Sequence, residues 1–440
     1  MSLSPFPQRS KSFTAFSLPR FDLQPRVESV TIGDMSSVSR RGFMAAGAAA
    51  FTAASYAQVK GANERLLIGV IGCGGMAMGH MRNLLKLKDE QNTQITFVCD
   101  IYQKRLDGAA ALTGGKPLKE YRKLLEQKDI DYVLIATPEH WHAQMAMDAL
   151  DAGKHVYLEK PMTRYVEEAR KLYAKVQSKP NLKLQVGVQG MSDDSYAEAH
   201  RLIREGAIGK VVLAQIDYSR NQKDDYWVWP IDQDAKPGVN LDWNAFLGPA
   251  KKRPWDPDRF FRWRRYWDYS GGIASDLFVH RVTRIIKACG LTFPEYGVGT
   301  GGKFQFPSSK SESPDTMNVL LDYPGGPTVQ LVSSLANDRR IDHLIRGHKA
   351  TIEFTPTGFT VVPQGIYKGE VKEFTYKKKG AEDTRLHHAN LQNAIRKNEP
   401  LNCDAALGYY GVVASEMGVV SLRRRKYLKW DKAKERLVNA

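Results

Sequence analysis

Residues 68–79 read Ile-Gly-Val-Ile-Gly-Cys-Gly-Gly-Met-Ala-Met-Gly, an apolar strand that runs into a glycine-rich turn and then a helix. Gly72 suits the tight turn, and Gly74 lets the backbone approach phosphate groups closely because it carries no Cβ. Ala77 supplies the small side chain that packs the helix against the strand. The N–H groups and the positive end of the helix that begins near Met76 face an anion. The stretch therefore predicts a site for the pyrophosphate of a dinucleotide.

A second apolar stretch, residues 94–99, reads as a buried strand that ends at Asp100. A carboxylate in this position can accept hydrogen bonds from the ribose hydroxyls of an adenosine. The alternative is that Asp100 caps a helix. Because the carboxylate would repel a 2′-phosphate, Asp100 favours NAD over NADP, although Arg105, nearby in the sequence, weakens that preference.

Two further apolar stretches, residues 131–136 and 155–158, read as buried strands of a parallel sheet, and both end in polar residues. Ligands of open α/β sheets bind beyond the carboxyl ends of the strands, so these polar residues converge on one edge of the predicted sheet. For His142 a helix-capping or packing role is the alternative. The residues that we expect to bind the dinucleotide are Gly72, Gly74, Gly75, Met76, Ala77, Asp100, Arg105, Thr137, Pro138, His142, Glu159 and Lys160.

The composition is that of a globular chain with a basic surface. Its 440 residues exceed one ordinary core and predict two domains. The formal net charge of +16 is spread along amphipathic helices and forms no basic block, so we expect a solvated surface and no nucleic-acid partner. The 4 cysteines show no Cys-x-x-Cys spacing, and no set of His, Asp and Glu residues has the spacing of metal ligands. We therefore predict neither disulfides nor a metal site.

The amino-terminal end, residues 1–57, reads as an export leader. Residues 39–44 are Ser-Arg-Arg-Gly-Phe-Met, a twin-arginine pattern, and an Ala- and Gly-rich stretch follows that ends in Ser-Tyr-Ala. We predict export to the periplasm by the Tat translocase, with cleavage after Ala57. Residues 1–34 are rich in Ser and Pro and lack a helical period, so we expect translation to begin at Met35.

Export constrains how a dinucleotide can be used. The twin-arginine route carries proteins that are already folded, and a nicotinamide dinucleotide is abundant only inside the cell. We therefore predict that the cofactor is captured before export, is held tightly, and is reduced and reoxidised in place with a second substrate. No run of about 18 apolar residues follows the leader, so we do not expect an integral membrane protein.

The pattern changes beyond Gln189. A predicted helix and strand lead into residues 221–270, a long stretch rich in Trp, Tyr and Pro that has little regular period. Loops of this length are typically lids, binding loops or oligomer arms. Strands with alternating apolar residues follow at residues 316–322, 328–333, 350–354 and 358–362, and a last edge strand is predicted at 426–430.

These elements predict the fold class. We expect an α/β chain with an amino-terminal Rossmann domain, a doubly wound parallel sheet, over residues 64–187. Residues 188–430 are expected to form an α+β domain with an open, mainly antiparallel sheet, and residues 431–440 a tail. An open sheet face usually needs cover, so we expect a homodimer or a homotetramer.

Several motifs occur together in a characteristic order: Gly72-Cys73-Gly74, Asp100, Thr137-Pro138 with His142, Glu159-Lys160-Pro161, and Gly271-Gly272 followed by Asp276 and His280. In this order the chain resembles the glucose-fructose oxidoreductase, inositol dehydrogenase and rhizopine-catabolism (Gfo/Idh/MocA) family, from about residue 66 to residue 430. The resemblance implies that Lys160, Asp276 and His280 surround a nicotinamide ring and the reacting hydroxyl. One departure is Phe278, which stands where the family has a small residue and is expected to narrow the substrate side.

The oxidation of an alcohol requires the same kinds of groups. Oxidation of an alcohol needs a base for the hydroxyl proton and a cation that stabilises the developing alkoxide. His280 has the side chain whose usual pKa lies nearest to neutral, and Asp276 on the same predicted helix face orients the imidazole or binds substrate. Lys160 supplies the cation, and either Lys160 or His280 transfers the proton. The alternatives are a surface Lys160 paired with Glu159, and a structural His280 paired with Asp276.

Aromatic residues crowd the stretch before Gly271. Aromatic rings beside Arg, Asp and Asn side chains suit the C–H faces and hydroxyls of sugars, while core packing is the alternative for each ring. We expect the substrate, a carbohydrate or polyol, to contact Gln189, Tyr218, Trp227, Trp263 and Trp267.

The predicted function is hydride transfer between a sugar, glycoside or polyol hydroxyl and a bound nicotinamide cofactor. Two alternatives stay open. One is a glycoside hydrolase or epimerase that oxidises its substrate only transiently, although the branch resembling this chain tends to lack the lysine that corresponds to Lys160. The other is a sugar-binding scaffold without catalysis, which an intact set of Lys160, Asp276 and His280 opposes.

Overall fold

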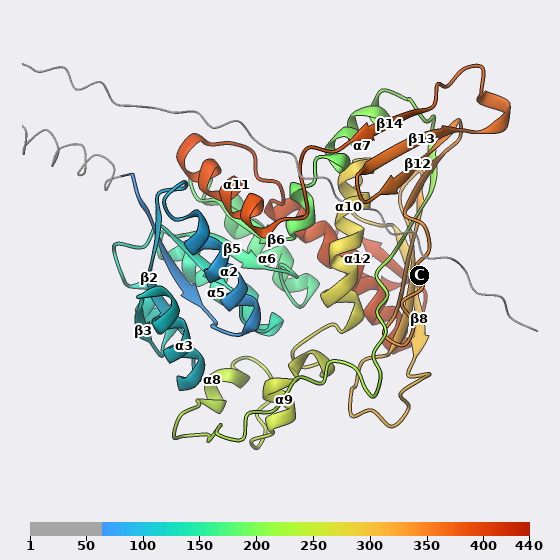
Figure 1. The fold of residues 1–440 in the computed structure, drawn as a ribbon. Coiled ribbons are helices and arrows are strands. Elements are labelled where there is room, and N and C mark those ends of the chain that lie inside the picture. The colour runs from blue at the N-terminus through green and yellow to red at the C-terminus, as the bar shows by residue number, and fades with distance from the viewer. Residues whose placement is uncertain (1–63) are drawn as a thin grey trace, which may run out of the picture. The chain divides into compact units, whose positions relative to one another are not determined.

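Two sheets organise residues 64–440, the part of the chain that the structure, a computed structural model, describes (Figure 1). The predicted leader, its twin-arginine pattern, the cleavage after Ala57 and the start at Met35 lie outside the described residues.

The first sheet is six-stranded and parallel, in the order β3-β2-β1-β4-β5-β6. The central strands β1 and β4 are buried on both faces, which explains their near-continuous apolar sequences. This sheet and its helices confirm the predicted Rossmann architecture. The strands are β1 (Leu66–Ile71), β2 (Thr93–Cys99), β3 (Lys116–Leu118), β4 (Tyr132–Ile135), β5 (His155–Glu159) and β6 (Leu184–Gly187). The helices are α2 (Gly75–Leu87), α3 (Gln103–Thr113), α4 (Tyr121–Leu125), α5 (His142–Asp151) and α6 (Val166–Gln177).

The second sheet is ten-stranded, in the order β14-β13-β12-β11-β7-β10-β9-β8-β15-β16. Only the pair β7 and β10 is parallel among its described neighbours, so the prediction of a mainly antiparallel sheet is confirmed. The strands are β7 (Val211–Asp217), β8 (Tyr296–Gly302), β9 (Thr316–Asp322), β10 (Thr328–Ser334), β11 (Leu344–Gly347), β12 (Ala350–Thr355), β13 (Gly358–Pro363), β14 (Phe374–Lys377), β15 (Leu428–Asp431) and β16 (Arg436–Asn439).

Helices α10 (Val279–Cys289) and α12 (Ala405–Arg424) cover one face of the second sheet, and α7 (Ser195–Arg204) packs against α10 (Figure 1). Helix α12 is the one described helix that is long and apolar enough to cross a membrane, yet 72% of its most apolar window is buried in the protein. It packs so closely on β8 that a Cβ on Gly299 would lie 2.1 Å from the carbonyl oxygen of Gly418. Core packing therefore accounts for its apolar composition.

Some predicted elements differ from the structure. Between α3 and β4 the structure adds strand β3 and the short helix α4. The strand expected at the edge is β15, and β16 flanks it and occupies the expected tail. Helix α11 (Thr384–Lys397), which no pattern predicted, packs against α2 of the Rossmann domain. Elements of three to five residues are too short for apolar periodicity to identify, which explains most of these differences.

Residues 221–270, here called the strap, contain α8 (Trp243–Leu247) and α9 (Pro257–Phe261), visible at the bottom of Figure 1. The strap docks on the Rossmann domain. The Gln103 N–H donates to Asn240 O at 2.8 Å, and the Asp242 N–H donates to Ile101 O at 3.1 Å. Its apolar side chains form a cluster of their own around one Rossmann residue: Tyr102, with Leu241, Trp243, Phe246, Leu247, Phe260, Tyr266 and Tyr269.

Candidate active site

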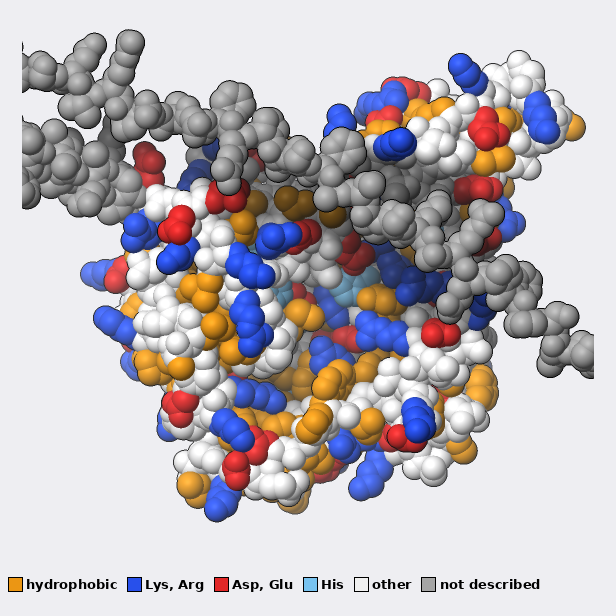
Figure 2. Space-filling model, viewed as in Figure 1, with side chains coloured by type: hydrophobic (Ala, Val, Ile, Leu, Met, Phe, Trp, Pro, Cys, Tyr) orange, Lys and Arg blue, Asp and Glu red, His pale blue; other side chains and the backbone are white. Residues whose placement is uncertain are grey.

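A cavity of about 650 Å³ lies beyond the carboxyl ends of β1, β2, β4 and β5, between the Rossmann domain and the strap. In Figure 2 the same face is hollowed, and basic and histidine side chains show on the walls of the hollow. This is the edge of an open α/β sheet at which ligands bind. The predicted residues that line the cavity are Gly72, Gly74, Gly75, Met76, Asp100, Arg105, Thr137, Pro138, Glu159, Lys160 and Trp263.

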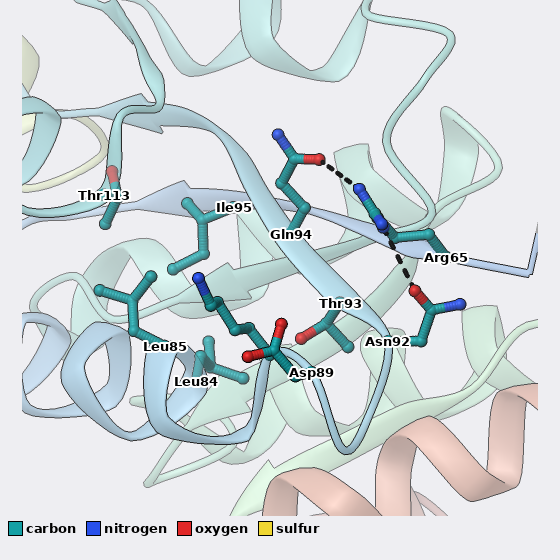
Figure 3. A pocket seen from close by; sticks show the side chains of 10 residues that line it. Arg65, Leu84, Leu85, Asp89, Asn92, Thr93, Gln94, Ile95 and Thr113 are labelled. Carbon is teal, nitrogen blue, oxygen red and sulfur yellow. Dashed lines mark hydrogen bonds between the residues drawn. The ribbon is translucent and has the colours of Figure 1, made fainter. Parts of the chain in front are cut away.

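A second cavity, of about 480 Å³, lies at the amino ends of β1 and β2 (Figure 3). Arg65 donates there to Asn92 Oδ1 at 3.2 Å and to Gln94 Oε1 at 3.4 Å. None of the predicted site residues lines it. It lies at the wrong end of the strands for a ligand of this fold, so the first cavity is the candidate active site.

The glycine turn has the shape of a cradle. Gly72 adopts φ +84°, and a Cβ there would lie 2.9 Å from Ala136 O, so only glycine fits. At Gly75 a Cβ would meet no protein atom within 4 Å, and at Gly74 it would meet only the Arg105 guanidinium, at 4.0 Å. Both glycines therefore leave open space at the start of α2. Ala77 is fully buried, as a helix packed on a strand requires.

Asp100 performs a structural task and also lines the cavity. Its carboxylate accepts the Cys73 N–H at 2.7 Å and the Tyr102 N–H at 2.8 Å, which ties the glycine turn to the start of α3. Burial raises the pKa of Asp100. The guanidinium of Arg105 lies 5.0 Å from the Phe260 ring of the strap. Asp100 and Arg105 thus place a carboxylate near a cation at the expected adenosine end.

The polar residues after β4 divide into two groups. Thr137 Oγ1 is buried with no hydrogen-bond partner and borders the cavity, as does Pro138. His142 instead contacts two backbone carbonyls, Pro161 O at 2.7 Å from Nδ1 and Thr137 O at 2.9 Å from Nε2. His142 does not line the cavity, so it holds the loops after β4 and β5 together, which was its alternative role.

Glu159 begins a buried chain that no sequence pattern predicted. Its Oε1 lies 2.8 Å from His80 Nε2, and His80 Nδ1 lies 2.8 Å from His388 Nε2 on α11. An ionised Glu159 requires His80 to donate through Nε2, and in the neutral tautomer His80 Nδ1 is then the acceptor for His388 Nε2. Burial alone would raise the pKa of Glu159, but the bond from His80 and the charge of Lys160 hold that pKa below its usual value. The Glu159 carboxylate thus contacts His80, whereas the Lys160 ammonium forms its ion pair with Asp276.

Lys160 and Asp276 meet at the centre of the site, one from each domain. Lys160 Nζ lies 2.8 Å from Asp276 Oδ1 and 2.9 Å from Asp276 O. Arg264, from the strap, donates through Nε to the same Oδ1 at 2.9 Å. Lys160 and Asp276 are 8% and 7% exposed, so Lys160 is not a surface lysine. Burial would raise the pKa of Asp276, but the two cations hold that pKa well below its usual range.

His280 lies one turn beyond Asp276 and does not bond to it. Residues 274–278 form a π-helical turn that ends where α10 begins, a distortion common at functional sites, and the Asp276 carboxylate is directed to Lys160 and Arg264. His280 Nδ1 is buried without a hydrogen-bond partner, and the ring packs edge-on against Tyr218 at 5.9 Å. Burial and the charge of Lys160 hold the pKa of His280 well below its usual value. The imidazole is therefore neutral at neutral pH.

The aromatic residues have different environments. Trp263 lines the cavity together with Trp229, and the Arg264 guanidinium stacks 4.2 Å from Trp263 and 5.1 Å from Trp229. Trp227 does not reach the cavity, because it is 6% exposed and packs in the main core. Trp267 packs against that core as well, and Tyr266 and Tyr269 belong to the apolar cluster of the strap. Gln189 is half-buried at the start of a short 3₁₀ turn.

The described residues hold no group of three or more His, Cys, Asp or Glu side chains that could bind a metal ion. Cys73, Cys99 and Cys403 are buried and Cys289 is half-buried, all four unpaired.

Profiles of one oxidoreductase family match most of the described chain. Residues 66–188 match the part described as an NAD-binding Rossmann fold, and residues 200–430 match the part described as a C-terminal alpha/beta domain.

The individual proteins compared below share at most 28% sequence identity with the chain. The chain is 28% identical to Glycosyl hydrolase family 109 protein 1 of Shewanella sp. (strain ANA-3) over 170 residues, 35% of each chain. It is 27% identical to inositol 2-dehydrogenase of Rubrobacter xylanophilus over 201 residues, 45% of this chain and 54% of that protein. The matched segments thus span from about a third to about half of these curated relatives. Levoglucosan dehydrogenase, solved with NADH and levoglucosan, shares the fold with a TM-score of 0.66 and 19% identity, over 84% of this chain and 100% of that one.

Proposed function

Because the chain belongs to the Gfo/Idh/MocA oxidoreductase family, we propose that it is an NAD-dependent oxidoreductase acting on a CH–OH group of a sugar, glycoside or polyol. The observation that carries the proposal is the contact of Lys160 with Asp276 beside the cavity of the Rossmann domain. A buried cation from one domain and a buried carboxylate from the other meet where a hydroxyl would react. A scaffold without catalysis has no need of this arrangement.

The cavity fits a dinucleotide. Gly74 and Gly75 leave open space at the start of α2, where N–H groups attract a pyrophosphate. Thr137 Oγ1 is a buried hydroxyl without a protein partner, and Asp100 borders the far end. These residues would hold NAD, and the nicotinamide would supply the hydride acceptor next to Lys160.

Residues of the chain would stabilise charge, transfer the proton and contact the substrate. The Lys160 ammonium, held by Asp276, stabilises negative charge on the reacting oxygen. His280 is neutral, and a neutral imidazole has one unprotonated ring nitrogen that can take a proton. Either His280 or Lys160 removes the hydroxyl proton, and variants of the two residues separate these routes. Trp263 and Trp229 offer flat apolar surfaces to the substrate's C–H groups.

A panel of neutral and acidic sugars, glycosides and polyols tests the function. The purified protein with its bound cofactor is mixed with each compound, and the absorbance of reduced nicotinamide is followed together with release of the aglycone. Net reduction by at least one compound is the expected result. Ligand binding without reduction or cleavage would favour the scaffold and would contradict the proposal.

A glycoside hydrolase that oxidises its substrate transiently is the second candidate, supported by the 28% identity to a glycosyl hydrolase family 109 protein. The presence of Lys160 favours the dehydrogenase. In the same assay this candidate predicts cleavage of a glycoside without net reduction of the cofactor.

We also propose that the protein is exported through the Tat translocase to the periplasm and retains its cofactor. Phe246, Phe260 and Phe261 of the strap border the cavity opposite the Rossmann edge, so contacts with the strap would slow the release of a bound dinucleotide. Protein isolated from the periplasm without added cofactor should release NAD(H) on denaturation, as mass analysis would show. An amino terminus at Gln58 would support cleavage after Ala57, whereas a peptide from residues 1–34 would contradict a start at Met35.

The open face of the second sheet supports a homodimer or homotetramer. Leu320 of β9 is 43% exposed on this face and pairs in register with Val298 of β8. Light scattering should give a mass of two or four subunits, and Leu320→Asp should shift it toward one. A monomeric wild-type protein would contradict this proposal.

A further inference from the structure

Tyr218, directly after β7, lies between two arginines on the His280 side of the site. The guanidinium carbon of Arg281 is 4.1 Å from the centre of the Tyr218 ring, and that of Arg220 is 5.0 Å away. Arg220 Nη2 also donates to the Tyr218 hydroxyl at 3.2 Å. The same ring packs against His280 at 5.9 Å, and the charge of Arg281 acts on the imidazole.

Neither arginine has a carboxylate partner. Within residues 64–440, no ion pair joins Arg220 or Arg281 to an Asp or Glu side chain, and Arg281 Nε is buried without a hydrogen-bond acceptor. Glu382, the carboxylate whose charge acts on Arg281, is bound by Arg284 at 2.6 Å. Burial and the charge of Arg284 lower the pKa of Arg281 to about 10, so Arg281 remains a cation at neutral pH. A partly buried guanidinium without an acceptor is costly unless a ligand supplies one.

A third cation comes from the strap. Arg264 uses Nε to bind Asp276, while its two Nη atoms make no hydrogen bond within the described part of the chain. The planar guanidinium is held over Trp263 and Trp229 at the edge of the cavity. Asp276 is already shared by Lys160 and Arg264, so it does not neutralise the arginines beside Tyr218. The substrate side therefore carries an excess of positive charge.

We propose that the substrate is a sugar with an anionic substituent, such as a sugar acid or a sugar phosphate, and that Arg281 and Arg220 bind its anionic oxygens. This inference rests on the proposed oxidoreductase function and names the substrate class of the same site. A guanidinium fork matches two oxygens of a carboxylate or phosphate. The positive charge of Arg264 adds to the attraction for the anion. The Tyr218 ring contacts the guanidinium groups of Arg281 and Arg220 and helps to hold them in place. A neutral sugar offers hydroxyl oxygens as acceptors but no negative charge to balance the guanidinium groups.

Paired ligands test the inference. Glucose, glucuronate and glucose 6-phosphate, and then methyl glucoside with the corresponding uronide, are compared by equilibrium binding to the cofactor-loaded protein and by reduction of the cofactor. The acidic member of a pair should bind about 10- to 100-fold more tightly than the neutral member, the range for hydrogen bonds to charged groups. The uronate and phosphate arms identify which anion the site prefers.

Variants locate the anion. Arg281→Gln and Arg220→Gln should each remove most of this preference, mainly by raising KM for the acidic sugar, and Arg281→Lys should restore part of it. Arg204→Gln, which removes an exposed arginine at the end of α7, is the charge-matched control and should leave the preference intact. Arg220 is exposed, so its variant should fold even if Arg281→Gln does not.

The outcomes separate the two proposals. Selective binding of acidic sugars with reduction of the cofactor supports both. Selective binding without reduction or cleavage supports the anion site and contradicts the oxidoreductase. Equal or better binding of the neutral sugars, binding of neither member of any pair, or a preference that survives both Arg→Gln variants would overturn the inference.

Discussion

The glycine turn after β1 and the strap over residues 221–270 are opposite walls of one cavity, and they reach that position in different ways. At Gly72 the backbone itself defines the wall, through φ +84° and a 2.9 Å approach that excludes a Cβ. The strap instead depends on side-chain contacts between distant residues, such as Arg264 with Asp276 and Arg105 with Phe260. A substitution at Gly72 should therefore disturb the first wall at once. The strap should lose its position gradually, as its side-chain contacts are removed one by one.

Loss of the central cation should have the largest effect. Lys160→Ala is expected to fold and to keep its cofactor, yet to lose about 10²- to 10⁴-fold in turnover, the range for a positioned proton-transfer group. Lys171→Ala, which removes an exposed lysine of α6, is the matched control. Steady-state kinetics with cofactor content measured in parallel check this, and unchanged turnover would remove Lys160 from the mechanism.

Asp276 joins Lys160 of the Rossmann domain to Arg264 of the strap. Asp276→Asn should therefore reduce the free energy of unfolding by about 3–5 kcal/mol, as buried Lys160 and half-buried Arg264 would lose their counter-charge. The folded-state pKa of Asp276 lies below its unfolded value of about 3.9. The pair therefore stabilises the protein fully above that value, and its contribution is lost as the pH falls through the folded-state pKa. Urea unfolding across the acid range should show a weaker pH dependence for the variant than for wild type, and parallel curves would contradict this.

Substitutions of two glycines in the turn distinguish backbone strain from steric conflict with the ligand. Gly72→Ala should cost about 1–2 kcal/mol from the left-handed backbone alone, plus the clash with Ala136. Gly75→Ala should fold normally, because its Cβ meets no protein atom, and should still weaken cofactor binding by filling the cradle. Thermal unfolding and cofactor titration distinguish them. Normal cofactor affinity in Gly75→Ala would argue that no ligand occupies that space.

The smallest effect is expected for a substitution in the strap. Trp229 is 42% exposed, so Trp229→Ala should leave stability within about 0.5 kcal/mol of wild type. Loss of its contact with Arg264 should raise KM about two- to fivefold, as expected for roughly 0.5–1 kcal/mol of cation–π attraction. Kinetics with a turned-over sugar measure this, and a large loss of stability would mean that the strap is part of the core.

The same contrast explains what the sequence could predict. Gly72, Gly74 and Ala77 could be identified because the local sequence of strand, turn and helix requires small residues at these positions. Lys160 could be identified because the carboxyl ends of the strands in a parallel sheet lie at the same edge. Arg264 was missed because its role depends on a carboxylate from another element. Trp227 and Trp263 both lie in the same aromatic-rich stretch, and tertiary packing places one in the core and the other at the cavity.

The relay from Glu159 through His80 to His388 was missed for a similar reason. His80 and His388 are separated by more than half of the chain, so no local pattern links them. A histidine on the buried face of α2, one turn beyond Ala77, is an unusual position for an ionisable group and was the available signal. Asp276 likewise lay on the expected helix, but the π-helical turn directed its carboxylate to Lys160 instead of His280.

A double-mutant cycle of Lys160→Met and Asp276→Asn, read as the rate of reduction of bound cofactor, tests most directly whether these residues form one functional unit. If they do, the double variant should be about as slow as the slower single variant, because either change already dismantles the pair. Effects of the two single changes that multiply in the double variant would show that Lys160 and Asp276 act independently and would contradict the account.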